Sequence, residues 1–243
     1  MSSILSIAKK ISRFSNESGN IEIEARFRSI ENRKTTSIGE MDFEYLFDFL
    51  TSSLSSKREM TTDYYHQGAR FTQVENDFYL TTKEELFRET LNADNRSLKF
   101  SVSREEKTKT DFDPFGDFEM KREKERFSFS EENLSLDLTR VTTTEKDGDP
   151  TKSFEFEIEV INPKKYSPKK FSDAVVKYFD VYDRHTKDVF LFCNLALSNN
   201  TDENDKGISY DLVSRPRDLL KIDLTSPNSI LQGYTVSIKA DGV

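Results

Sequence analysis

The stretch FEFEIEV, residues 154–160, is the strongest indication of a fold in this sequence. Successive side chains of a β-strand point to opposite faces, so a strand here places Glu155, Glu157 and Glu159 on one face and the apolar side chains on the other. Like charges on one face repel one another, and buried charges have to be paired or bound to a metal. Three aligned carboxylates therefore predict a nearby source of positive charge.

The stretch IEIEARF, residues 21–27, shows the same period of two. Its polar face carries Glu22, Glu24 and Arg26. Any one such strand is compatible with a sheet that has one solvated face, which antiparallel sheets commonly have. Here, however, carboxylates concentrate on some strands and cations on others, whereas solvated faces usually mix the two. The basic strand is residues 122–130, REKERFSFS, whose cationic face holds Arg122, Lys124 and Arg126.

The composition limits the classes of protein to consider. The chain has 243 residues, of which 36 are basic and 44 acidic, giving a net charge of −8. An anionic substrate must therefore be met by a local cluster of cations or by a metal. The 20 Phe and 9 Tyr argue against disorder. A single cysteine, Cys193, excludes an internal disulfide and is expected to be a buried thiol, and no apolar run reaches the roughly 20 residues needed to span a bilayer.

The periodicity predicts an α+β fold. Apolar residues at helical spacing predict a helix over residues 3–14, and Ser37 and Glu40 have the spacing of a capping box before a second helix. From residue 61 to residue 160 the period is two, with turn residues such as Gln67-Gly68 between the strands. Helices are expected again over residues 171–179, with Ser172 as a cap, and over residues 188–197.

Successive strands without intervening helices predict an antiparallel sheet or barrel. Amphipathic helices on either side can cover the apolar face from outside, which leaves the charged face lining the interior of a closed barrel. About eight strands give an interior wide enough for side chains or one small ligand. Carboxylates on two strands suit Mg²⁺ or Mn²⁺, and cations on the others suit a polyanion such as a triphosphate.

ExExR at the first strand and ExExE at the last resemble the two metal-binding glutamate motifs of the triphosphate tunnel metalloenzymes. Three intervening stretches support this resemblance, namely SVSREE, KREKERFSF and LSLDLTRV. The similarity covers residues 21–160. It is greatest to the metal-dependent RNA triphosphatases of fungi, protozoa and large DNA viruses, and it implies an eight-stranded antiparallel barrel with flanking helices.

The resemblance also implies the roles of individual residues. The metal ligands would be Glu22, Glu24 and Glu159, and either Glu155 or Glu157 would position the attacking water. The candidates for clamping the phosphates are Arg70, Lys99, Arg122, Lys124 and Arg126. Glu105 and Asp137 would orient those cations or the water. Arg26 could be an interior ligand or a counter-charge for Glu22 and Glu24, and Arg28 is expected at the surface.

A second resemblance lies at the end of the sequence. Lys239, Ala240, Asp241 and Gly242 form KADG, which is similar to the KxDG motif of covalent nucleotidyltransferases, whose lysine forms the lysyl-nucleotide intermediate. The order of the two resemblances is that of viral multifunctional capping enzymes. It implies a triphosphatase domain over residues 1–205, and a linker with the start of a guanylyltransferase domain over residues 206–243. We therefore expect an amino-terminal fragment of a longer viral polypeptide, with a methyltransferase domain as a possible further part.

The expected reaction is removal of the γ-phosphate from 5′-triphosphate RNA, in the host cytoplasm or in the virion and without a membrane. A tunnel phosphohydrolase for free nucleoside triphosphate or inorganic tripolyphosphate uses the same glutamates and remains an alternative. A non-catalytic module that binds RNA ends is a further alternative, although the full set of glutamates argues against it.

Overall fold

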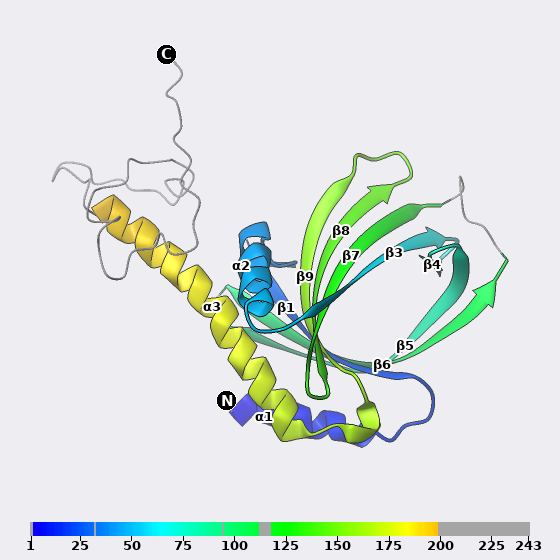
Figure 1. Cartoon of the computed structure of the whole chain (residues 1–243), viewed down its shortest axis with the longest axis horizontal. Helices are drawn as coiled ribbons and strands as arrows, with labels where there is room; N and C mark the ends of the chain where they lie inside the picture. The colour runs from blue at the N-terminus through cyan, green and yellow to red at the C-terminus, as the bar shows by residue number, and fades with distance from the viewer. Residues whose placement is uncertain (1, 32, 94, 112–117, 199–243) are drawn as a thin grey trace, which may run out of the picture. The chain divides into compact units, whose positions relative to one another are not determined.

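The computed structural model of the protein describes residues 2–31, 33–93, 95–111 and 118–198 (Figure 1). The chain divides into two compact units, Met1–Val189 and Phe190–Val243. The described strands all belong to the first unit. Of the second unit the structure describes only residues 190–198, which are helical. No described helix has the length and apolar character needed to cross a bilayer.

Strands make up most of the first unit. The helical elements are α1 (Ser2–Ile11), η1 (Ser12–Phe14), α2 (Glu40–Thr51), η2 (Pro163–Lys165) and α3 (Pro168–Ser198). The strands are β1 (Ile21–Glu31), β2 (Lys34–Thr36), β3 (Ser56–His66), β4 (Ala69–Val74), β5 (Asp77–Ala93), β6 (Arg96–Thr110), β7 (Met120–Glu131), β8 (Leu134–Glu145) and β9 (Thr151–Val160).

Eight of these strands close into an antiparallel barrel. Their order is β1-β6-β5-β4-β3-β7-β8-β9, and pairing between β9 and β1 closes the ring. The short β2 pairs with the far end of β1 and lies outside the ring. The predicted α+β fold with an eight-stranded antiparallel barrel and flanking helices is confirmed.

The apolar face of the strands points outward and is buried beneath the helices (Figure 1). Phe27 of β1 packs on Phe156 of β9 with ring centroids 4.6 Å apart, and Tyr182 of α3 meets the edge of Phe27. On another part of the barrel, Phe47 of α2 packs edge-on against Phe127 of β7 at 4.9 Å. Because this core lies between barrel and helices, the interior of the barrel is left to polar side chains.

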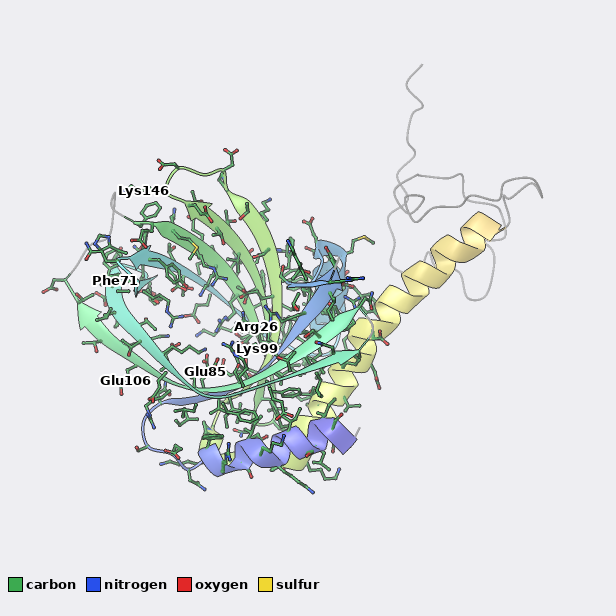
Figure 2. The ribbon with its side chains drawn as sticks, turned by 180° about the vertical axis from the view of Figure 1, so that it is seen from behind. Arg26, Phe71, Glu85, Lys99, Glu106 and Lys146 are labelled. Atoms are coloured by element: carbon green, nitrogen blue, oxygen red, sulfur yellow. The ribbon has the colours of Figure 1, made fainter. Side chains whose placement is uncertain are left out.

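The polar face points into the barrel. Arg26 of β1 and Lys99 of β6 are cross-strand partners, and Figure 2 shows them beside each other. Figure 2 also shows Phe71, Glu106 and Lys146 toward another end of the barrel. The period of two thus separates an outer face, which the helices cover on part of the barrel, from a polar inner face.

The turn between β3 and β4 has the predicted two residues. Gln67 and Gly68 have φ values of 49° and 76°, the left-handed conformation that two-residue hairpin turns of this type require. Gly68 adopts it without steric cost, because it has no Cβ. The predicted turn at Gln67-Gly68 is therefore confirmed.

Two predictions about helix ends are wrong. Helix α2 begins at Glu40 with Gly39 as its N-cap, and no side chain caps it. The chain stays extended through Ile38, whose N–H donates to the Phe154 carbonyl at 3.2 Å, so Ser37 lies too early to cap the helix. The two helices expected after residue 170 form one continuous helix, α3, and Ser172 lies inside it rather than at its cap. The segment between them, residues 180–187, contains neither proline nor glycine, the residues that most often end a helix.

Candidate active site

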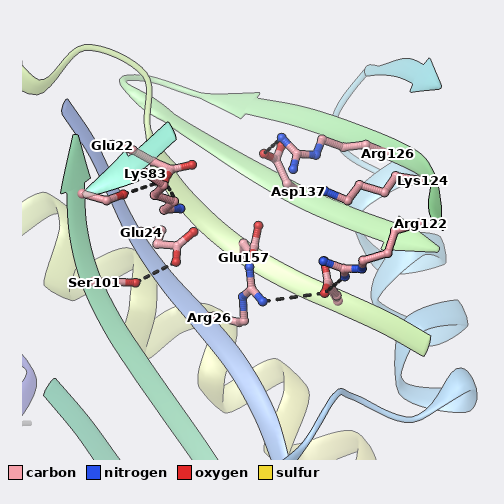
Figure 3. A network of polar contacts seen from close by, with 12 residues as sticks. Glu22, Glu24, Arg26, Lys83, Ser101, Arg122, Lys124, Arg126, Asp137 and Glu157 are labelled. Carbon is pink, nitrogen blue, oxygen red and sulfur yellow. Dashed lines mark hydrogen bonds and ion pairs between the residues drawn. The ribbon is translucent and has the colours of Figure 1, made fainter. Parts of the chain in front are cut away.

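A cavity of about 310 Å³ lies inside the barrel, and charged side chains form most of its lining. Its acidic residues are Glu22, Glu24, Glu59, Asp63, Glu105, Glu155, Glu157 and Glu159. Its basic residues are Arg26, Arg70, Lys83, Lys107, Arg122, Lys124 and Arg126. The two predicted acidic strands and the predicted basic strand therefore surround one space (Figure 3).

Glu22, Glu24 and Glu159 form an acidic cluster on two adjacent strands. Glu24 of β1 lies directly opposite Glu159 of β9 in the antiparallel register. The Ser101 hydroxyl donates to Glu24 at 2.7 Å, and the Ser103 hydroxyl donates to Glu22 at 2.9 Å. The small hydroxyl residues of β6 thus hold the two carboxylates of β1 in place.

The carboxylates of this cluster differ in their protonation. Burial raises the pKa of Glu159 to about 8, and repulsion by Glu22, Asp137 and Glu157 adds to the shift while Arg126 opposes it. Burial and the charge of Glu157 also raise the pKa of Glu24. Burial acts on Glu22 as well, but the ammonium of Lys83 outweighs it and lowers the Glu22 pKa. The surroundings therefore disfavour the charged forms of Glu24 and Glu159, whereas Lys83 favours the charged form of Glu22.

Arg26 lies beyond the acidic cluster and holds the remaining glutamates of β9. Its guanidinium forms an ion pair with Glu157 and lies 3.6 Å from Glu155. Arg122 of β7 also contacts Glu155, at 3.0 Å. Burial raises the pKa of Glu155, but the two guanidinium groups outweigh it and lower that pKa. The open question about Arg26 is thereby answered: it faces the interior, and its ion-pair partners are Glu155 and Glu157 rather than Glu22 and Glu24.

The cations of β7 form a basic wall across the cavity from the acidic cluster. The wall consists of Arg122, Lys124 and Arg126, and each has an acidic partner. Lys124 forms an ion pair with Asp63 of β3, and Arg126 lies 3.7 Å from Asp137 of β8. Because each cation is held by a carboxylate on another strand, the wall is positioned before any substrate binds.

A third group of charges lies where β4 and β6 face the cavity. Arg70 donates to Glu105 at 2.9 Å, and Lys107 lies 3.2 Å from the same carboxylate. Arg70 thus faces the cavity as predicted for a phosphate clamp. Glu105 is its hydrogen-bond partner, and the roles of both residues stay predictions.

Sequence analysis missed four charged residues of the cavity lining, Glu59, Asp63, Lys83 and Lys107, and two of these hold predicted site residues. Lys83 of β5 donates to Glu22, and Asp63 of β3 accepts from Lys124 and from the Thr72 hydroxyl, the latter at 2.7 Å. The alternation in Thr61-Thr62-Asp63 and in Thr81-Thr82-Lys83 places both on the polar faces of their strands. The alternation is visible in the sequence, but a single charged residue next to threonines is too weak a pattern to predict a site residue.

Two predicted site residues within the described part of the chain lie outside the cavity lining. Asp137 is buried behind the lining, where it accepts from Ser135 at 2.6 Å and pairs with Arg126, so it can orient that cation as predicted. Lys99 shares the inner face with Ser101 but does not line the cavity. Lys239 of KADG lies outside the described residues. Arg28, expected at the surface, is partly buried and lies on the same face of β1 as Glu24, outside the cavity lining.

The acidic cluster can be tested for its fit to a metal. Among the described residues, no three His, Cys, Asp or Glu side chains are already gathered in a metal-binding arrangement. Glu22, Glu24 and Glu159 nevertheless offer only oxygen donors, which suit hard divalent cations. Burial and the neighbouring carboxylates raise the Glu159 pKa, and a bound cation would favour the charged form of that carboxylate. In donor type and charge, the cluster fits a divalent cation.

The fold occurs in solved RNA triphosphatases. Residues 95–175 match the family described as mRNA capping enzyme, beta chain. The structure of the S. pombe RNA triphosphatase Pct1 superposes with a TM-score of 0.56 at 15% identity, covering 76% of this chain and 88% of Pct1. Pct1 has also been solved in complex with the Spt5 CTD, with the same TM-score and identity over 80% of this chain and 91% of Pct1.

A viral structure is similar as well. The RNA triphosphatase domain of a trifunctional mimivirus mRNA capping enzyme superposes with a TM-score of 0.51 at 14% identity, covering 73% of this chain and 94% of that domain. The comparison with curated protein sequences gives no match.

Proposed function

We propose that this chain, which contains a triphosphate tunnel domain of the RNA triphosphatase family, removes the γ-phosphate from the 5′-triphosphate end of RNA, the first step of mRNA capping. The observation that carries the proposal is the meeting of two opposed charge clusters in one enclosed space. The acidic cluster of β1 and β9 faces the basic wall of β7 across a cavity of about 310 Å³. A triphosphate with a divalent cation would match both sides at once, because the carboxylates would hold the cation and the basic side chains would hold the phosphates.

Triphosphate tunnel RNA triphosphatases depend on a divalent metal, and Mg²⁺ or Mn²⁺ is proposed here. Glu22, Glu24 and Glu159 would hold it. When bound, such an ion acts as a Lewis acid that withdraws charge from the γ-phosphate and helps to align the attacking water.

The chain's own cations hold the substrate. Phosphoryl transfer is catalysed mainly by positioning and by neutralising charge on the transferred group. Arg126, Lys124 and Arg122 project from one strand into the cavity, and Arg70 projects from β4 (Figure 3 shows the first three). Their carboxylate partners fix the side-chain directions, so little reorganisation is needed when the phosphates bind.

Glu157 is the better of the two candidates for positioning the water. Glu155 is bound by both Arg26 and Arg122, which lower its pKa and make it a poor proton acceptor. Glu157 pairs with Arg26 alone and is the register partner of Asp137 on β8. The attacking water would give up its proton as its oxygen bonds to the γ-phosphorus, and the leaving group is the 5′-diphosphate end of the RNA.

The test is phosphate release from RNA labelled at the γ-position, with Mg²⁺ or Mn²⁺ supplied. Glu22→Gln and Glu24→Gln are expected to reduce release to near background, because each removes a carboxylate from the acidic cluster without changing side-chain size. Glu44→Gln, on the outer surface of α2, is the matched control and is expected to retain full release. No release by the wild type, or release unaffected by both cluster variants, would count decisively against the proposal.

Free nucleoside triphosphate and tripolyphosphate present the same phosphates and remain alternative substrates. RNA, ATP and tripolyphosphate should be compared at equal concentration with each metal. A kcat/KM that is highest for RNA supports the capping reaction, and one that is highest for tripolyphosphate supports a small-molecule phosphohydrolase.

A covalently continuous guanylyltransferase is proposed as the partner of this domain. This proposal rests on KADG, residues 239–242. The guanylyltransferase would accept the diphosphate end that the tunnel produces. The full-length polypeptide should form a labelled covalent adduct with α-labelled GTP that Lys239→Met abolishes.

A further inference from the structure

A cluster of cations on the inner face of three adjacent strands lies outside the cavity lining. Arg28 comes from β1, Lys99 from β6 and Arg88 from β5. The register aligns them closely: Lys99 is opposite Arg26, Arg88 is opposite Ser101, and Arg28 is opposite Ser97. We call Arg28, Arg88 and Lys99 the exit surface.

A β-bulge places Arg88 on this face. Before the bulge, Lys83 and Glu85 are opposite Glu105 and Ser103, on the inner face of β6. The register shifts between Glu85 and Phe87, so that Phe87 faces outward, where it packs against Phe14 at 5.9 Å. Its neighbour Arg88 consequently points inward, although uninterrupted alternation from Lys83 would have turned it outward.

The cations of the exit surface have fewer ion-pair partners than those of the basic wall, although Glu24 and Glu85 attract Lys99 and Glu155 attracts Arg28. Among the described residues Arg28 and Lys99 form no ion pair, and Arg88 pairs only with Glu85, three positions away on its own strand. Burial lowers the pKa of Arg28, and the charges of Arg26 and Arg88 lower it further. The basic wall differs, because each of its cations has a carboxylate partner on another strand. Three like charges that repel one another on a partly exposed surface favour a polyanion.

The exit surface is reachable from outside the tunnel. In the described structure, β4 covers only Asp77–Thr81 of β5, and residues 82–93 pair with β6 alone. The side of the barrel next to Arg88 is therefore not closed by a second strand. From Glu24 to Arg28 the distance along β1 is about 13 Å, which lets a chain whose 5′ end lies at the acidic cluster reach Arg28.

The cations near another opening of the tunnel have a carboxylate as ion-pair partner. Arg70 and Lys107 share Glu105, and the exposed Ile161 lies at the cavity edge there. On the exit surface the aromatic side chains of the same strands, Phe27, Phe87 and Phe100, face outward into the core. No described aromatic ring is thus placed by these strands to stack on a base, and the contacts would be to phosphates, independent of sequence.

We propose that the exit surface binds the phosphodiester backbone of the RNA just 3′ of the triphosphate, and so gives the tunnel its preference for RNA over free nucleotides. This inference rests on the proposed function for the identity of the polyanion. It assigns a role to Arg28 and Arg88, which have no part in the triphosphate cavity, and it makes Lys99 a backbone contact rather than a clamp on the triphosphate.

The test measures binding of a fluorescent single-stranded RNA of about eight nucleotides, a length typical of single-strand sites, by anisotropy in EDTA so that nothing is hydrolysed. The variant Arg28→Gln/Arg88→Gln/Lys99→Gln is expected to bind 5′-triphosphate RNA about tenfold more weakly. Because each lost phosphate contact to a single strand lowers the salt slope by about 0.7, the slope of log K against log salt should fall by about 2. A 5′-hydroxyl RNA should compete with the wild type but hardly with the variant.

The matched control is Lys9→Gln/Lys152→Gln/Lys169→Gln, which removes the same charge from exposed positions on α1, β9 and α3 and should bind RNA like the wild type. A second variant, Arg28→Lys/Arg88→Lys, keeps the charge and should keep most of the affinity, which separates charge from misfolding. Unchanged RNA affinity and salt slope in the glutamine variant would overturn the inference, as would an equal loss in the control. The proposed function is tested by a different experiment, and it is wrong if wild-type protein with metal releases no phosphate from RNA.

Discussion

Asp63 is the carboxylate that holds Lys124 of the basic wall, and its replacement by asparagine tests how the wall is built. Asp63 has only 2% of its surface exposed. It accepts from Lys124 and from the Thr72 hydroxyl at 2.7 Å. Asparagine keeps the size of the side chain and an oxygen that can accept from Thr72. The substitution therefore removes mainly the negative charge, and Lys124 is left as an unpaired cation whose side chain is 15% exposed.

Removing one partner of a buried ion pair costs about 3–5 kcal/mol. The lower end applies here, because the Thr72 hydrogen bond survives and the flexible Lys124 can turn toward water. We expect Asp63→Asn to lower the free energy of unfolding by about 3 kcal/mol, which for a domain of this size corresponds to roughly 6–12 °C in Tm.

The loss should depend on pH in a defined direction. Burial raises the pKa of Asp63, but the charge and hydrogen bond of Lys124 and the hydrogen bond of Thr72 outweigh it and lower the pKa below 3.8. The unfolded chain therefore takes up a proton at a higher pH than the folded one. The stability from this carboxylate is fully present above pH 3.8 and is lost as the pH falls through the lowered value. The difference between wild type and variant should be constant near neutral pH and shrink in acid.

The measurement is urea unfolding of both proteins from neutral to acidic pH, without metal. The double variant Asp63→Asn/Lys124→Met is the control, and it should recover much of the loss, because replacing both members of a buried pair by neutral groups costs far less than removing one. A loss below about 1 kcal/mol, or one that persists undiminished well below pH 3.8, would refute the idea that this ion pair supports the wall.

Three further outcomes are expected. Arg126→Gln should lower kcat for phosphate release by about 100- to 1000-fold, the typical effect of removing one transition-state donor. Arg58→Gln, on the outer face of β3, is the control and should leave kcat unchanged. Equal rates in the two variants would contradict the role of the basic wall. Phe156→Ala should lower the free energy of unfolding by about 3–5 kcal/mol in urea melts, because this ring is fully buried against Phe27 and α3. Met60→Ala, at an exposed position, is the control. An equal loss of stability in the two variants would contradict a core between barrel and helices. Mn²⁺ with tripolyphosphate at about 100 times Kd should raise the free energy of unfolding by about 2.7 kcal/mol, EDTA should reverse the rise, and no shift in a thermal melt would argue against a metal-phosphate site.

Residues on the same face of an uninterrupted strand could be assigned from the sequence alone. Alternation in residues 21–27 and 154–160 places the glutamates of each stretch together, because the side-chain period of a strand is fixed by backbone geometry. The same argument assigned Arg122, Lys124 and Arg126 to one face. Alternation of this kind is local, so it needs no knowledge of the partner strands. The identity of the helix-covered face followed similarly from the position of the phenylalanines.

The partners across the barrel were decided only by the tertiary structure. Lys83 reaches Glu22, and Asp63 reaches Lys124, each across 61 positions of sequence. Such pairs depend on register, which pattern on one strand cannot supply. Arg26 shows the same limit, since its neighbours Glu22 and Glu24 are on its own strand, yet the ring closure with β9 gives it Glu155 and Glu157 instead.

The direction of the Arg88 side chain could not be predicted from the sequence pattern. Strict alternation on β5 turns it outward, and only the bulge between Glu85 and Phe87 turns it into the tunnel. This bulge lies where β5 pairs with β6 alone, and the alternation of β5 by itself does not mark it, so the pairing of β5 with β6 decided the direction of Arg88. The sequence alone determined the faces of the regular strands; barrel closure decided which opposite charges meet and which cations remain without a partner.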